Sequence, residues 1–347
     1  MQYIVPQVIA TWCSEHRLSA ASASGKSRSD NEPVRTSVFL RTLGRANPDA
    51  RQLAWAIFVV MFDRIVVGYA GDQAGRDAVR LAARIAAVLS SHVTVVFPYH
   101  PLLASVPGDL AEESVRGEVQ ALVAGIENLA APTCHWTPSP WPIHGLHELA
   151  SYEKADLIVF GAAREGLADH LHVSLMERMV HGAPCAVGVA PAGYANGDPA
   201  ELRRVGVGFS DSEEGRAALH LAHELAGILG GELEVIAGSG LSSALASYAF
   251  SSPSLPQVEN EMYAETKANL ERVAGDLDGG APVHLETIGG DPSGVLIERS
   301  SNLDILMLGS RAYGPLRHVL LGSVSARAMR EAHCPVLVVP RGTPQHG

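Results

Sequence analysis

Short apolar runs alternate along most of the chain with segments whose apolar residues recur at helical spacing. In the first half, the runs predict buried strands: "RIVVGY" (64–69), "HVTVVF" (92–97), "ADLIVF" (155–160) and "CAVGVA" (185–190). One helix is predicted after the first strand from the spacing of Ala74, Ala78, Leu81, Ile85 and Val88. A second follows the second strand on Val115, Val119, Leu122, Ile126 and Leu129, and a third helix is expected between the last two strands.

The same order of segments returns in the second half. "RIVVGYAGD" (64–72) is similar to "RVGVGFSDS" (204–212), and "GRDAVRLAARIA" (75–86) is similar to "GRAALHLAHELA" (215–226). "ADLIVFGA" and "APCAVGVAP" likewise match "LDILMLGS" and "AHCPVLVVP". Because the order is kept throughout, the chain contains a duplicated domain, with a first repeat at 62–194 and a second repeat at 201–341.

The second repeat has its own series of predicted elements. Strands are expected at "RVGVGF", "LEVIA", "VHLETI", "DILML" and "PVLVV", with a helix near 257–277. Asp211 or Ser212 begins another helix, and Glu213 and Glu214 fall in its first turn, where the helix dipole favours acidic residues. Apolar strands alternating with helices predict an α/β fold, a parallel sheet with helices on both faces.

A glycine-rich loop near the C-terminus is the strongest candidate for chemistry. "GSRAYGPLRHVLLGS" (309–323) follows a predicted strand and ends at a predicted helix start. Glycines let backbone N–H groups approach an anion, and a helix N-terminus adds unpaired N–H donors. Ligands of parallel α/β sheets gather at the carboxyl ends of strands, so this position favours phosphate binding over a plain surface connection.

Four features occur together in this chain: the repeat, this loop, the "GDPSGVLIE" helix entry and the terminal "CPVLVVP" strand. Through these features the chain resembles the universal stress protein family in its tandem form. The family's ATP-binding signature is a glycine, two residues, a glycine, nine residues, then glycine and Ser or Thr. Gly309 matches its first position and Gly322 with Ser323 its last, whereas Ala312 replaces the second glycine.

The resemblance implies a five-stranded parallel sheet in each repeat, Rossmann-like and of the adenine-nucleotide alpha-hydrolase type. The two repeats would pack as an intramolecular pseudo-dimer. It also implies ATP, with or without Mg²⁺, as the ligand of the second repeat. The implied loop contacts are Gly309, Ser310, Arg311, Ala312, Gly322, Ser323, Val324 and Ser325, and the implied residues at the base end are Phe209, Ser210 and Gly238.

The first repeat departs further from that signature than the second. The family commonly has an aspartate after the first strand, where this chain has Ala70 and Ser210. The first-repeat loop is one residue shorter and has Val173 and Ser174 in place of the final glycine and serine. Since valine does not permit the same close backbone approach, the first repeat is expected to be a degenerate copy that packs against the second.

Composition narrows the functional classes. A net charge of −11 argues against nucleic-acid binding, and no apolar run is long enough to cross a bilayer. The four cysteines form no zinc-binding spacing or disulfide framework, which favours the cytoplasm. Residues 1–60 are Ser-rich in part, and two explanations stay open: a disordered extension, or a start codon assigned too far upstream.

Other residues with reactive side chains have ordinary explanations. His144 and His147 have a spacing that can share a metal, but no matched ligand set accompanies them. Ser323 and Ser325 lack a nucleophile elbow, and nothing orients His318 as a base. Cys185 and Cys334 begin apolar strands as core residues, and the segment Asp291-Pro292-Ser293 forms a helix cap.

These observations favour a cytoplasmic regulator that binds an adenine nucleotide in its second repeat and acts in a stress response. The alternatives are a nucleotide-independent interaction module in which both sites have decayed, and a slow ATPase. No catalytic base is evident for the ATPase. The expected binding partners are an adenine nucleotide, a second copy of the chain, or another protein.

Overall fold

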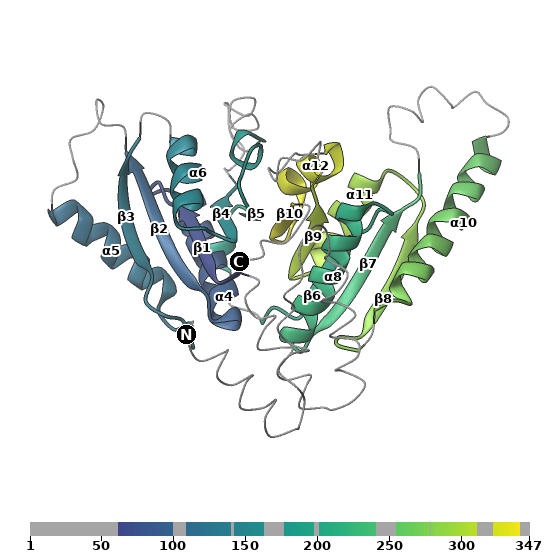
Figure 1. The fold of residues 1–347 in the computed structure, drawn as a ribbon, viewed down its shortest axis with the longest axis horizontal. Helices are drawn as coiled ribbons and strands as arrows, with labels where there is room; N and C mark the ends of the chain where they lie inside the picture. Colours follow the sequence, from purple (N-terminus) through teal and green to yellow (C-terminus); the bar gives the residue numbers. More distant parts are fainter. Residues whose placement is uncertain are drawn as a thin grey trace, which may run out of the picture. The chain divides into compact units, whose positions relative to one another are not determined.

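The computed structural model describes residues 62–99, 109–139, 142–162, 177–197, 201–240, 255–277, 279–310 and 322–340. Within these ranges every strand and helix belongs to one of the two repeats (Figure 1). The elements of the first repeat are, in chain order, β1 (Arg64–Gly68), α4 (Gln73–Leu89), β2 (His92–Tyr99), α5 (Asp109–Val123), β3 (Thr133–Pro138), α6 (Pro142–Tyr152), β4 (Leu157–Gly161) and β5 (Ala186–Ala190).

A short 3-10 turn, η3 (Tyr194–Asn196), follows β5 and leads toward the second repeat. The elements of the second repeat are β6 (Arg204–Gly208), α8 (Glu213–Ile228), β7 (Glu232–Gly238), α10 (Leu255–Ala274), β8 (Val283–Ile288), α11 (Pro292–Arg299), the 3-10 turn η4 (Ser300–Asn302), β9 (Ile305–Gly309), α12 (Ser323–Glu331) and β10 (Val336–Val339).

The strands form one ten-stranded sheet with the order β3-β2-β1-β4-β5-β10-β9-β6-β7-β8. Within each repeat all neighbouring strands are parallel, which confirms the predicted fold class. The two halves join where β5 and β10 pair antiparallel, with Gly188 opposite Leu337. A Cβ added at Gly188 would lie 2.8 Å from the Leu337 side chain, so this join is closely packed.

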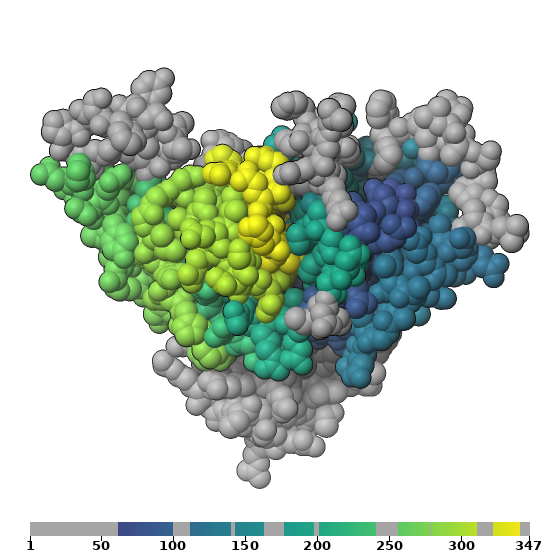
Figure 2. Space-filling view, turned by 180° about the vertical axis from the view of Figure 1, so that it is seen from behind, coloured from purple at the N-terminus to yellow at the C-terminus, as the bar shows by residue number. Residues whose placement is uncertain are grey.

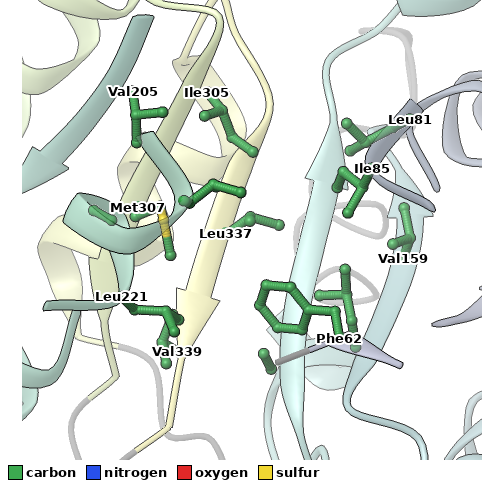
Figure 3. Close-up of a cluster of buried hydrophobic side chains, with 14 of the residues drawn as sticks. Phe62, Leu81, Ile85, Val159, Val205, Leu221, Ile305, Met307, Leu337 and Val339 are labelled. Atoms are coloured by element: carbon green, nitrogen blue, oxygen red, sulfur yellow. The ribbon is translucent and has the colours of Figure 1, made fainter. Parts of the chain in front are cut away.

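Successive strand residues point into two cores, one on each face of the sheet. One core includes Val67, Val207 and Leu337 beneath α4, α5, α8 and α10, and Figure 3 shows side chains of both repeats within it. The other includes Val66, Val187 and Val338 beneath α6, α11 and α12. Figure 2 shows that the yellow C-terminal elements adjoin the teal end of the first repeat, and Arg330 of α12 lies 3.3 Å from Glu177 there.

The sequence pattern misplaced a few elements. It does not predict β3, because this edge strand has the polar sequence "TCHWTP" and only partly buried side chains. Val88 is 40% exposed, since Leu89 takes the buried position in the last turn of α4. Helix α5 ends at Val123, so Ile126 and Leu129 lie beyond it. No helix in the described part of the chain is both long and apolar enough to cross a membrane.

A buried carboxylate fixes the segment that leaves the first repeat. Asp77 of α4 is completely buried, and its two oxygens accept hydrogen bonds from the backbone N–H groups of Gly193 (2.7 Å) and Ala195 (2.8 Å). Gln73 donates to the same carboxylate at 2.9 Å. Three donors compensate the burial of this charge. The equivalent residue of α8 is Ala217, so this anchor belongs to the first repeat only.

We expect Asp77→Ala to lower the free energy of unfolding by about 3 kcal/mol, because the backbone N–H groups of Gly193 and Ala195 lose their acceptor. The control is Asp72→Ala. Asp72 is the exposed N-cap of α4 and accepts from Gly75 at 2.8 Å, and its loss is expected to cost about 1 kcal/mol. Urea unfolding measures both variants. Equal losses would show that the linker anchor contributes nothing beyond an ordinary cap.

Candidate functional site at the carboxyl edge of the second repeat

Backbone hydrogen bonds align the residues that follow the parallel strands of the second repeat. The N–H of Phe209 donates to Ile236 at 2.8 Å, and the N–H of Ser310 donates to Val339 at the same distance. Register pairs Gly208 with both Ile236 and Leu308, so the ends of β6, β7 and β9 lie side by side. The structure therefore brings the predicted residues Phe209, Ser210, Gly238, Gly309 and Ser310 to one edge of the sheet.

Two of these glycines are required by packing. A Cβ at Gly309 would lie 2.7 Å from the carbonyl oxygen of Glu214 in the first turn of α8. A Cβ at Gly238 would lie 2.6 Å from Cα of Pro292, the first residue of α11. Each glycine lets a helix begin directly against the strand end. Their presence therefore has a structural reason that holds with or without a ligand.

Ser310 is unusual among the residues of this edge because its hydroxyl is buried. Ser310 is 1% exposed, yet its Oγ has no hydrogen-bond partner among the described residues. A buried hydroxyl without a partner costs free energy, and native proteins contain few of them. The nearby Ser325 differs, because its Oγ donates to the Gly309 carbonyl oxygen at 3.3 Å and so links α12 to the end of β9.

Helix α12 begins at this edge. Gly322 is its N-cap, with φ −84° and ψ 162°, and as a glycine it makes no side-chain cap hydrogen bond. Ser323 is exposed and Val324 is half-buried in that turn. The first N–H groups of a helix have no partner within the helix and attract anions. Arg311 and Ala312, two further predicted contacts, lie outside the described residues, as does the comparison pair Val173 and Ser174.

The start of α8 supplies polar groups beside the strand end. Ser212, one of the two predicted caps, is the N-cap, and its Oγ accepts from the Gly215 N–H at 3.0 Å. The exposed Ser210 lies with its Oγ 3.3 Å from that of Ser212. Asp211 does not cap the helix. It accepts from Arg216 (2.6 Å) and Arg272 (2.9 Å), and the hydrogen bond from Arg216 lowers its pKa.

The sequence did not predict the role of Arg327, which connects α12 to α11. Arg327 donates to Asp291 at 2.8 Å and to Ser293 at 3.0 Å, and Ser293 donates to Asp291 at 2.6 Å. Asp291 occupies the predicted N-cap position of α11, but its side chain makes no cap hydrogen bond. No local spacing signals this contact, because Arg327 and Asp291 meet only through the packing of two helices.

Aromatic side chains fill the corresponding edge of the first repeat. Tyr69 lies 6.2 Å from Phe97 between ring centroids, and Phe97 lies 6.3 Å from Trp136. In the strand register Phe97 is opposite Trp136, while the equivalent pair in the second repeat is Ala237 and Thr287. Burial, with the Glu118 carboxylate nearby, raises the pKa of the Tyr69 hydroxyl. The two repeats thus differ in the size of the side chains at this edge. The sequence did not predict this difference, because it did not predict β3.

The other reactive side chains have structural roles. His144 pairs with Glu148 at 3.2 Å, and His147 contacts the Met179 carbonyl oxygen at 2.8 Å. Within the described ranges no three His, Cys, Asp or Glu side chains gather as a metal site. Cys334 is buried, and burial raises its pKa to about 12, so its thiol stays protonated at neutral pH. His170, His172 and His318 lie outside the described residues.

Comparison with known proteins shows which family has this sequence and fold. A model of the universal stress protein family matches residues 61–191 and 201–340. A universal stress protein of Mycobacterium tuberculosis is 25% identical over 294 residues, covering 80% of this chain and 99% of that protein. One from Methanocaldococcus jannaschii is 36% identical over 64 residues, covering 18% of this chain and 38% of that protein.

Solved structures show the same fold. The crystal structure of a universal stress protein from Archaeoglobus fulgidus matches with a TM-score of 0.55 at 18% identity, over 81% of this chain and 99% of that chain. A protein of unknown function from Pseudomonas aeruginosa matches with a TM-score of 0.51 at 16% identity, over 81% and 94% of the two chains. The family match covers most of both repeats, and the chain therefore belongs to the universal stress protein family, with two of its domains in tandem.

Proposed function

We propose that the second repeat binds ATP at its carboxyl edge. The observation that carries the proposal is the buried Ser310 hydroxyl, which has no partner among the described residues and lies in the chain between the end of β9 and the start of α12. A phosphate or ribose oxygen at this edge would give that hydroxyl the partner it lacks, and so compensate the cost of burying it. The family signature that Gly309, Gly322 and Ser323 resemble supports the same ligand.

The start of α12 supports a phosphate at this place. Its N-cap, Gly322, has no side chain, so no side-chain oxygen competes for the first N–H groups of the helix. A phosphate oxygen near Gly322 and Ser323 would accept from these donors and benefit from the helix dipole. Bound Mg²⁺ would further neutralise the phosphates, and the exposed Ser323 hydroxyl of this turn would offer it an oxygen ligand.

We infer that the chain binds one nucleotide, in the second repeat. In the first repeat, Phe97 and Trp136 occupy the strand ends where the second repeat has Ala237 and Thr287. Aromatic side chains there reduce the room for an adenine ring. The first repeat then serves as the packing partner of the second, joined to it through β5 and β10.

In this proposal ATP acts as a bound signal. Binding would change the surface at the carboxyl edge of the second repeat, which a partner protein recognises in a stress response. We assign no reaction to the bound nucleotide. The buried thiols of Cys185 and Cys334 support a reducing compartment, and we propose the cytoplasm.

Two equally buried serines provide a test. Ser310→Ala is expected to weaken ATP binding about three- to tenfold in calorimetry, because one hydrogen bond to the ligand is lost. The same change is expected to leave the unfolding free energy of the unliganded protein unchanged or to raise it by up to about 1 kcal/mol, since an unpartnered hydroxyl is removed.

Ser300→Ala is the matched control. Ser300 is also 1% exposed, but its Oγ donates to the Ile297 carbonyl oxygen at 2.6 Å and accepts from the His333 N–H at 2.9 Å. This variant is expected to lose about 1 to 3 kcal/mol of stability with no change in ATP affinity. ATP affinity that is equal in Ser310→Ala and in the unmodified protein would count against a ligand at Ser310.

A further inference from the structure

A pocket of about 230 Å³ lies between the two repeats, away from the carboxyl edge of the second repeat. Its walls are α4 of the first repeat, the segment 191–197 that follows β5, and His333, which precedes β10. Because β10 ends at the carboxyl edge, a residue before its start lies at the opposite edge of that sheet. The pocket is therefore a separate feature that touches both repeats.

Two arginines with unused donors line this pocket. Arg80 donates from Nη1 to the Leu122 carbonyl oxygen at 2.7 Å, and Arg84 donates from Nη1 to the Tyr194 hydroxyl. Neither has a carboxylate partner in the part of the chain that the structure describes. A guanidinium has five N–H donors, so most donors of both side chains are available.

The remaining lining adds polar groups but no acidic side chain. Arg84 lies 5.4 Å from the centroid of the Tyr194 ring, which holds its guanidinium in place. The Tyr194 hydroxyl accepts from Arg84 and can donate its own hydrogen to a ligand. His333 is an exposed residue of the lining and comes from the second repeat. Asp77 fixes the segment 191–197 of the lining, because it accepts hydrogen bonds from the Gly193 and Ala195 N–H groups.

The second repeat does not share this set of residues. In the repeat alignment, His220 and Glu224 of α8 stand where α4 has Arg80 and Arg84. Ala217 stands where α4 has Asp77, so the second repeat also lacks this anchor. The two arginines are therefore a property of the first repeat and not a requirement of the shared strand-helix plan.

We propose that this pocket binds the phosphate group of a small molecule or inorganic phosphate itself. Guanidinium groups match phosphate oxygens with paired N–H donors, and two of them supply the positive charge that a dianion requires. A ligand held by Arg80 and Arg84 would also lie within reach of His333 of the second repeat. Occupation of the pocket would then stabilise the contact between the repeats.

The test uses the full-length protein with Gly322→Val, so that the proposed nucleotide site does not contribute. Inorganic phosphate is expected to bind this variant saturably in calorimetry and to raise its melting temperature relative to chloride at equal ionic strength. Adding Arg80→Gln is expected to weaken binding about tenfold or more, because a charged hydrogen-bond donor is lost. Arg84→Gln should do the same, although it also releases Tyr194.

Arg116→Gln is the control, because it removes one positive charge from an exposed position of α5 and should leave phosphate binding unchanged. AMP in the same variants separates the two ligand sources: tighter binding of AMP than of phosphate assigns a phosphomonoester, and equal binding assigns inorganic phosphate. Absence of saturable phosphate binding would overturn the proposal. So would phosphate binding that is lost in Gly322→Val alone, or that is unaffected by Arg80→Gln.

Discussion

Gly322→Val is expected to abolish ATP binding in calorimetry while leaving the circular-dichroism spectrum nearly unchanged. The backbone of Gly322, with φ −84°, is in a region open to any residue, so valine introduces no conformational strain there. Its branched side chain would instead occupy the space through which a phosphate reaches the first N–H groups of α12. Loss of binding would thus report on the approach of the ligand.

Two controls accompany this variant. Gly322→Ala adds a single methyl group and is expected to give an intermediate affinity. Val173→Gly restores the signature glycine in the first repeat, but it is expected to create no second site. The first-repeat loop is shorter, and Phe97 and Trp136 fill the strand ends there. Undiminished ATP affinity in Gly322→Val would refute the phosphate interpretation, and a lack of affinity in the unmodified protein would favour the interaction-module hypothesis.

Residues 201–347 produced alone are expected to form a homodimer, with a mass in light scattering twice that of the fragment. Strand β10 is buried on both faces, and its outer edge pairs antiparallel with β5 of the first repeat. Without that partner, a row of unpaired backbone groups and apolar side chains becomes exposed. A second copy of β10 can take the place of β5, because antiparallel pairing joins two copies of one strand about a twofold axis.

The separately produced first repeat provides the control. Mixed at equal concentration, it is expected to convert the homodimer into a complex of one first and one second repeat, since the native pair fits Gly188 closely against Leu337. A stable, well-folded monomer of residues 201–347 would contradict the importance of the β5–β10 contact.

Local patterns in the sequence determined much of the fold. Buried strands such as β1 and β9 are continuous apolar runs, and α4 and α8 have apolar residues at helical spacing. The sequence of each element therefore predicts both its type and which of its residues are buried. The repeat then showed that the two series fold alike. The residues that resemble the nucleotide signature were also identified from spacing, because the loop and its flanking elements are continuous in the chain.

Tertiary structure decided what depends on contacts between distant segments. The polar edge strand β3, the antiparallel join of β5 with β10, and the contact of Arg327 with Asp291 have no local pattern. The buried Ser310 hydroxyl, without a partner among the described residues, and the pocket of Arg80 and Arg84 likewise arise only when several elements pack together. The periodicity of apolar residues indicates which side of a helix or strand is buried. The contacts between distant side chains, and the cavities between elements, depend on how the helices and strands pack together.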